Sequence, residues 1–141
     1  MPTFLLKTEP SEYSFADLQR DGTTIWSGVS NPAALLALRS MRKGDHALIY
    51  HTGAEKAIVG LATVASNPRE DPAKPGQTPT GEPRFAVVEI KPLRPAQSPV
   101  TLAQLKSDAR FKSFQLVTHP RLSVMPVPPA IDALLRALTG L

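Results

Sequence analysis

The single tryptophan of this 141-residue chain, Trp26, has the chemistry of a stacking platform for a planar ligand. Gly28 follows it and allows the backbone to turn and to approach a ligand closely. Asn31 as N-cap and Pro32 as first helical residue fix the start of the next helix. We therefore expect the ring to be held at a defined place in a loop. The competing interpretation is a core aromatic, because tryptophan is highly buried on average.

Residues capable of catalysis occur without the partners that catalysis needs. Asp45, His46 and His51 could exchange protons, and Ser27 or Ser123 could act as a nucleophile, yet no third group stands at a suitable spacing. The chain has no Gly-x-Ser-x-Gly elbow, phosphate-binding loop or dinucleotide fingerprint. It has no cysteine, and its three histidines lack metal-ligand spacing. The sequence predicts binding rather than catalysis, with neither a metal nor a cofactor.

The charge is basic and uneven along the chain. The formal net charge is +4; residues 1–60 carry six Lys or Arg against six Asp or Glu, whereas residues 61–141 carry ten against six. Such an excess suits contact with a polyanion, although a solvated basic face has the same composition. The residues that we expect to hold backbone phosphates are Arg42, Lys43, Lys112 and Arg121.

Strands and short helices are expected to position these groups. Apolar runs predict strands at 3–8, 46–52, 57–65, 84–93 and 121–127, with the second and third joined as a β-hairpin. Helices are expected at 15–19, 32–42 and 102–107, with a further turn at 111–114, and a last helix begins at Pro128-Pro129. Two capping boxes, Ser14 with Asp17 and Thr101 with Gln104, start the first and third of these helices. Gly140 ends the last one.

The class that these elements indicate is α+β, as a single domain over residues 1–141. Strands separated by capped helices, without βαβ repetition, favour a small mixed or antiparallel β-barrel with short peripheral helices. Closure of that barrel would protect the strand edges. Residues 67–83 hold five of the fifteen prolines and are expected to form a long, exposed, mobile loop. Neither a long apolar run nor a signal peptide is visible, which predicts a cytoplasmic protein that does not enter membranes.

Five sequence segments follow one another in order over almost the whole chain. They are Lys7-Thr8-Glu9-Pro10 with Tyr13-Ser14, Trp26-Ser27-Gly28-Val29-Ser30-Asn31, Met41-Arg42-Lys43-Gly44-Asp45 with Ile49-Tyr50-His51-Thr52, Ile58-Val59-Gly60-Leu61-Ala62, and Arg121-Leu122-Ser123-Val124. Together these segments resemble the EVE domain family. This family belongs to the PUA-like superfamily of small β-barrels, which also contains the YTH readers of methylated adenine in RNA. The resemblance implies a non-enzymatic reader that takes a modified nucleobase into a pocket, with family members linked to modified cytosines in DNA.

The same resemblance implies a set of base-binding residues. In the related readers the end of the first strand contacts the base edge, and the tryptophan forms a wall of an aromatic cage. The residues that correspond here, or that would line or support the pocket, are Lys7, Thr8, Glu9, Tyr13, Trp26, Ser27, Asn31, Tyr50, His51, Thr52 and Ser123.

Glu9 departs from the YTH pattern, which has an asparagine there. A carboxylate only accepts hydrogen bonds, and therefore suits an exocyclic amine such as cytosine N4 rather than methyladenine. No second tryptophan is present, so Tyr13, Tyr50 or Leu122 would complete the cage.

The expected partner is nucleic acid, either DNA or RNA. A base inside a duplex cannot enter a pocket, so the strand must be single or the base must flip out, at a cost of a few kcal/mol. Two other interpretations stay open: a small enzyme that acts on a nucleotide or a modified nucleic acid in the same pocket, and a basic protein-interaction module.

Overall fold

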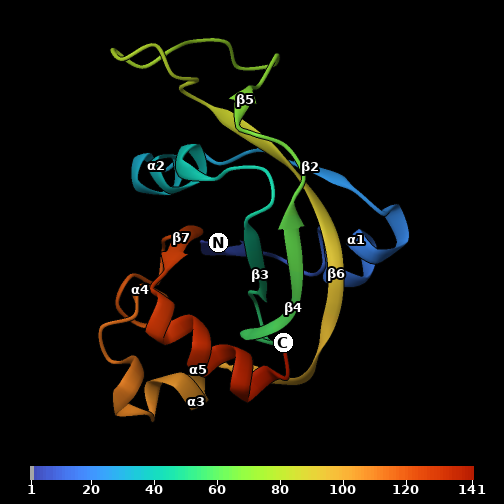
Figure 1. Cartoon of the computed structure of the whole chain (residues 1–141), viewed down its shortest axis with the longest axis vertical. Helices are drawn as coiled ribbons and strands as arrows, with labels where there is room; N and C mark the ends of the chain where they lie inside the picture. Colours follow the sequence, from blue (N-terminus) through green and yellow to red (C-terminus); the bar gives the residue numbers. More distant parts are fainter. Residues whose placement is uncertain (1) are drawn as a thin grey trace.

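A curled, mixed β-sheet forms the body of the molecule (Figure 1). The structure is a computed structural model that describes residues 2–141. Over this range the sheet has the order β2-β6-β4-β3-β1-β7, with β5 added to β6. Only β1 and β3 pair in parallel; the other pairs are antiparallel. The strands are β1 (Thr3–Thr8), β2 (Thr24–Trp26), β3 (His46–His51), β4 (Ala57–Val64), β5 (Arg69–Glu70), β6 (Ala86–Thr101) and β7 (Val124–Val127).

Short helices surround this sheet. Helix α2 packs against both β6 and β7, the second and the last strands of the sheet order. Thus β2 and β7 stand at opposite ends, and the expected barrel is an open half-barrel in the part of the chain that is described. The helices are α1 (Phe15–Asp21), α2 (Pro32–Ser40), α3 (Leu102–Lys106), the 3-10 turn η1 (Ala109–Phe111), α4 (Gln115–Thr118) and α5 (Pro129–Thr139).

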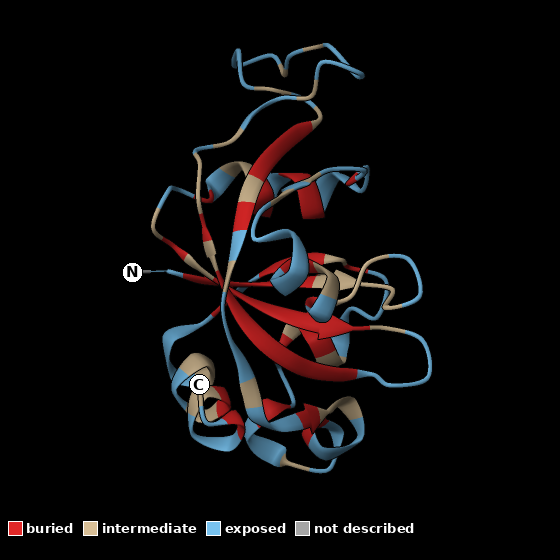
Figure 2. Ribbon diagram, turned by 90° about the vertical axis from the view of Figure 1, so that its right-hand side faces the viewer, coloured by how far each residue is buried: buried red, intermediate tan, exposed pale blue. Residues whose placement is uncertain are grey.

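The core lies on both faces of the central strands, which Figure 2 shows as a buried centre. Leu5, Leu48 and Leu61, on β1, β3 and β4, have no exposed surface. Because both faces of these strands are covered, their sequences read as continuous apolar runs rather than as alternating ones. Phe111 and Phe114 are also buried and extend the core toward α3 and α4.

The helix caps that the sequence predicts are confirmed. Both capping boxes form, at Ser14 and at Thr101. The Asn31 side chain accepts hydrogen bonds from the N–H groups of Ala33 and Ala34. Gly140 ends α5 with φ at 77°. These elements depend on contacts within four residues, which is why the sequence alone located them.

The extent of several elements was predicted wrongly. Strand β6 continues to Thr101 instead of ending at 93, and it passes through three prolines. Register shifts in its pairing with β4 accommodate residues that lack an N–H. Trp26 ends a short strand, not a loop, because Thr24–Trp26 pairs with β6. Helix α4 was not anticipated, and β7 begins at Val124 rather than 121.

The proline-rich segment 67–83 is largely exposed, as expected, and Figure 2 shows it projecting from the body. It is not a loop throughout, since β5 pairs with β6 and Gln77 forms a bridge with Pro83. Within residues 2–141, no helix is both apolar and long enough to cross a bilayer. In the same range, no three His, Asp or Glu side chains gather as a metal site would require.

Candidate functional site

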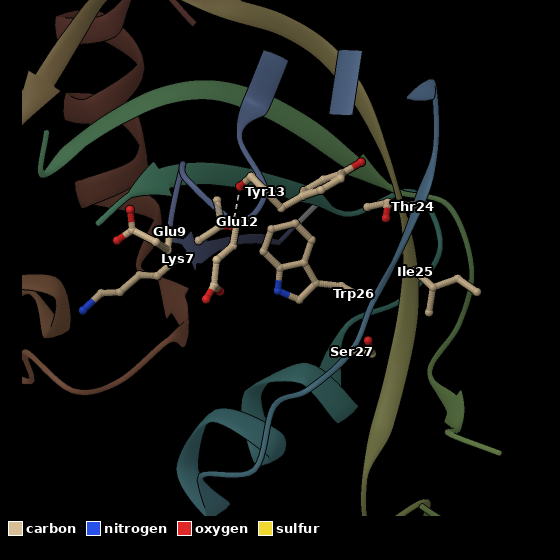
Figure 3. A pocket seen from close by; sticks show the side chains of 9 residues that line it. Lys7, Glu9, Glu12, Tyr13, Thr24, Ile25, Trp26 and Ser27 are labelled. Atoms are coloured by element: carbon tan, nitrogen blue, oxygen red, sulfur yellow. Dashed lines mark hydrogen bonds between the residues drawn. The ribbon is translucent and has the colours of Figure 1, made fainter. Parts of the chain in front are cut away.

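A pocket of about 340 Å³ opens between the end of β1, the turn that follows it, and β2 (Figure 3). We call it the Trp26 pocket. It brings together six of the residues that the sequence assigned to base binding, and three that it did not. The lining residues are Lys7, Thr8, Glu9, Glu12, Tyr13, Thr24, Ile25, Trp26 and Ser27.

A tight turn after β1 builds one wall of the Trp26 pocket. The carbonyl of Glu9 accepts hydrogen bonds from the N–H groups of Glu12 and Tyr13, both at 2.9 Å. The Thr8 hydroxyl donates to the Tyr13 carbonyl at 2.6 Å. Together these contacts fold the chain back over the end of β1. They present Glu12 and Tyr13 opposite the strand that carries Trp26.

The pocket has two aromatic side chains, which come from different elements. Trp26 is half-buried and packs against the core on one side, so it serves both as a core residue and as a pocket wall. The Tyr13 hydroxyl donates to Asp21 of α1 at 2.9 Å. Desolvation is the main cause that raises the pKa of Tyr13, which keeps the phenol protonated. Of the three candidates that the sequence offered for a second wall, Tyr13 is the one that lines this pocket.

The Glu9 carboxylate is already occupied by neighbouring groups. It accepts hydrogen bonds from the Ser11 backbone N–H and hydroxyl, and from the Thr52 hydroxyl at 3.0 Å. The Ser11 backbone contact, followed by Thr52, lowers the pKa of Glu9. Figure 3 shows this side chain directed away from the Trp26 ring. Glu9 therefore fastens the turn after β1 to the end of β3.

Glu12 is the pocket carboxylate that sequence reasoning missed. Its side chain is exposed and extends along the pocket on the side facing the indole ring (Figure 3). Among residues 2–141, no hydrogen bond or ion pair engages its carboxylate. The only sequence signal was its place directly before Tyr13, since the fold-back of the turn is what brings it to the pocket.

His51 has a structural position beside the pocket rather than a place in its lining. Its Nε2 accepts a hydrogen bond from the buried Phe15 N–H at 3.0 Å. The proton is therefore on Nδ1, which donates to Glu55 at 2.8 Å. His51 thereby ties the first residue of α1 to the end of β3.

The remaining predicted pocket residues lie around two neighbouring hollows. Asn31, Leu122 and Arg121 line a mainly apolar hollow of about 370 Å³. Tyr50 and Thr52 line another, of about 270 Å³, which shares Lys7 with the Trp26 pocket. Tyr50 is buried, and burial raises its pKa.

Ser123 supports β1, since its carbonyl accepts the Lys7 N–H at 2.9 Å. The predicted phosphate contacts are dispersed. Arg42 and Lys43 lie in the turn before β3, whereas Lys7 and Thr8 pair with the far end of that strand. Arg42 donates to the backbone carbonyls of Arg39, in α2, and of Met41. Lys112 is exposed just after η1.

The site offers two kinds of interaction to a ligand. The aromatic faces suit a flat ring, and the Glu12 carboxylate suits a group that donates hydrogen bonds. A volume of this size lies at the lower end of the roughly 300–1,000 Å³ that is usual for small-ligand sites. The geometry therefore fits a single planar, amine-bearing ring.

Known proteins share this architecture. A family model described as EVE domain matches residues 3–138. Human thymocyte nuclear protein 1 is 29% identical to the chain, over 88% of the chain and 68% of the human protein. The NMR structure of Rpa0253 from Rhodopseudomonas palustris is 34% identical, with a TM-score of 0.88 over 99% of this chain and 94% of that one.

A crystal structure of human THYN1 protein in complex with DNA containing 5-methylcytosine has a TM-score of 0.87 at 25% identity. It covers 99% of this chain and 98% of the human one. The predicted fold class, α+β with a small PUA-like β-barrel and short peripheral helices, is confirmed by this likeness, with the mixed sheet curled into a half-barrel. The chain belongs to the EVE domain family.

Proposed function

We propose that this protein is a non-enzymatic reader that binds DNA and takes one modified base, a 5-substituted cytosine, into the Trp26 pocket. The observation that carries the proposal is the pairing of two aromatic side chains, Trp26 and Tyr13, with one unoccupied carboxylate, that of Glu12. The human relative solved with DNA containing 5-methylcytosine supports the choice of polymer and base.

Stacking supplies the affinity in this proposal. Extrusion of a base from a duplex costs a few kcal/mol. Stacking on an aromatic side chain returns about 1–3 kcal/mol per base. Trp26 is suited to this because its ring is fixed by the pairing of β2 with β6 and by packing against the core.

The base edge is read by Glu12 rather than by Glu9. Cytosine presents an N4 amine, a hydrogen-bond donor, whereas thymine presents an O4 acceptor at the same place. A carboxylate with free lone pairs accepts from the first and repels the second. Glu9 has three donors already, so its contribution is to hold the turn that carries Glu12.

Titration of labelled DNA tests the stacking role. The probes are a short duplex with one 5-methylcytosine, the unmodified duplex, and an RNA of the same sequence. Trp26→Ala should weaken binding of the methylated DNA by about 5- to 150-fold, which corresponds to the loss of about 1–3 kcal/mol. Leu36→Ala is a matched control, since Leu36 is 65% exposed on α2 and lies outside the pocket lining.

Equal binding by wild type and by a folded Trp26→Ala variant would refute the role of the ring. Tighter binding of the RNA would refute the choice of DNA. Mass spectrometry of the recovered oligonucleotide tests the non-enzymatic part, because any change in its mass would indicate turnover.

A further inference from the structure

We propose that a second hollow, next to the Trp26 pocket, binds a backbone phosphate of the same DNA strand. This lysine hollow is defined by Lys7, Lys56 and Lys106 and has a volume of about 270 Å³. The inference rests on the proposed function, because it assigns the path of the strand whose base enters the pocket. Its lining does not include Arg42, Lys43, Lys112 or Arg121, the four residues that we expected to hold backbone phosphates.

The three lysines converge from separate parts of the chain. Lys7 is in β1, Lys56 directly precedes β4, and Lys106 is the last residue of α3. The carbonyl of Lys56 accepts the Leu102 N–H at 2.8 Å, which joins the start of α3 to the β3–β4 turn. Lys7 lines the lysine hollow and the Trp26 pocket alike. A ligand in one site is therefore adjacent to the other.

The lysine charges are not neutralised by the protein. Within residues 2–141, none of these three lysines takes part in an ion pair. The Lys7 amine donates to the Pro120 carbonyl at 3.0 Å and lies 5.8 Å from the centre of the Tyr50 ring. Its partial burial lowers its pKa, which is the response of a cation that lacks a counter-charge.

Two carboxylates near the lysine hollow, those of Glu9 and Glu55, are hydrogen-bonded to other groups. Glu9 lies against Gly53 and accepts its hydrogen bonds from Ser11 and Thr52. Glu55 is bonded to His51. An incoming phosphate therefore meets amines that have spare donors, while the nearby acids are directed to other groups. Phosphate is the anionic group that a strand with an extruded base would present there.

The backbone at Lys56 supports a role for its side chain. Its φ is 47°, and every other described residue with a positive φ is a glycine. This left-handed conformation is uncommon for residues with a Cβ, and glycine adopts it freely. The chain thus places a lysine where glycine would be relaxed. Such strain is concentrated at functional sites.

Salt dependence tests the proposal. The double variant Lys56→Gln/Lys106→Gln removes two charges at the lysine hollow, and the control Lys74→Gln/Lys91→Gln removes two charges from exposed lysines outside both linings. Each phosphate contact adds about 0.9 to the slope of log affinity against log salt. We expect the hollow variant to lose at least about one such contact. Between 50 and 200 mM NaCl, the decrease in its affinity should then be about 3-fold smaller than the decrease for wild type. The control should retain the wild-type slope.

Lys56→Gly separates binding from folding. Because glycine tolerates the backbone conformation, the variant should keep or raise its melting temperature while it binds methylated DNA more weakly at low salt. An unchanged slope in the hollow variant, or an equal reduction in the Lys74/Lys91 control, would overturn the proposal.

The two proposals also fail separately. If Trp26→Ala binds methylated DNA like wild type while the lysine variants lose salt dependence, the base pocket is refuted and the phosphate site is supported. If Trp26→Ala binds weakly while the lysine variants behave like wild type, the phosphate site is refuted and the base pocket is supported. The ratio of affinities for methylated and unmethylated DNA should stay constant in the lysine variants, because a phosphate contact carries no base information.

Discussion

Replacement of Gly60 by alanine should displace α1 from the sheet and disturb the Trp26 pocket with it. A Cβ at Gly60 would lie 2.6 Å from Cε1 and Cζ and 2.7 Å from Cε2 of Phe15. Ordinary carbon–carbon contacts are about 3.5–4.0 Å, so the ring must retreat by about 1 Å. Rotation of the ring does not help, because Cζ lies on the rotation axis.

The ring has little room to retreat. Phe15 is 5% exposed, and its N–H is held by His51. Overpacking of such a site costs about 1–3 kcal/mol. For a domain of this size we expect a fall in melting temperature of about 3–10 °C. Glu12 and Tyr13 lie three and two residues before Phe15, so affinity for methylated DNA should fall as well.

Urea unfolding and DNA titration of the Gly60→Ala variant check this expectation. Phe15→Leu provides the control, since leucine lacks the three ring atoms that would clash. The double variant should be less destabilised than the sum of the two single variants. If Gly60→Ala unfolds within about 0.5 kcal/mol of wild type and binds DNA equally well, α1 is not positioned by this contact.

Three further predictions concern the base edge, the pH dependence and a helix cap. Glu12→Gln adds a donor to the acceptor, so the preference for 5-methylcytosine over thymine, measured by competition, should fall about tenfold. Burial, followed by the charge of Arg136, lowers the pKa of His46, and the His46 Nδ1 accepts a hydrogen bond from the Arg136 guanidinium. Below about pH 6.5 His46 therefore binds a proton in the unfolded chain more readily than in the folded protein. The free energy of unfolding should therefore decrease as the pH is lowered below about 6.5, by at most about 1.4 kcal/mol per pH unit. Urea titrations of His46→Gln at several pH values should lack this decrease. Asn31→Ala removes the cap of α2 and should cost about 1 kcal/mol in urea unfolding, whereas Asn31→Asp should not.

Long-range register is where sequence reasoning failed. The end of β6 was placed at 93, where the apolar run of the sequence ends. Pairing with β4 continues past Pro95 to Thr101 because bulges remove the need for an N–H at those points. Likewise, Thr24–Trp26 has only three residues, too few for a periodic pattern, and becomes a strand through its neighbour β6.

The sequence by itself determined the features that depend on local physics. The capping boxes at Ser14 and Thr101, the Asn31 cap and the β3–β4 hairpin all follow from interactions between residues close in the chain. The sequence patterns also identified the family, and they placed Trp26 among the pocket residues. These features need no knowledge of which strands meet.

Only the tertiary structure decided which groups face the Trp26 pocket and which support it. Glu9 and Glu12 are three residues apart and chemically identical, so no local pattern ranks them. The fold-back of the turn over β1, and the approach of Thr52 from β3, occupy the first carboxylate and leave the second free. The lysine hollow has the same origin, because Lys7, Lys56 and Lys106 meet only when β1, the β3–β4 turn and α3 come together.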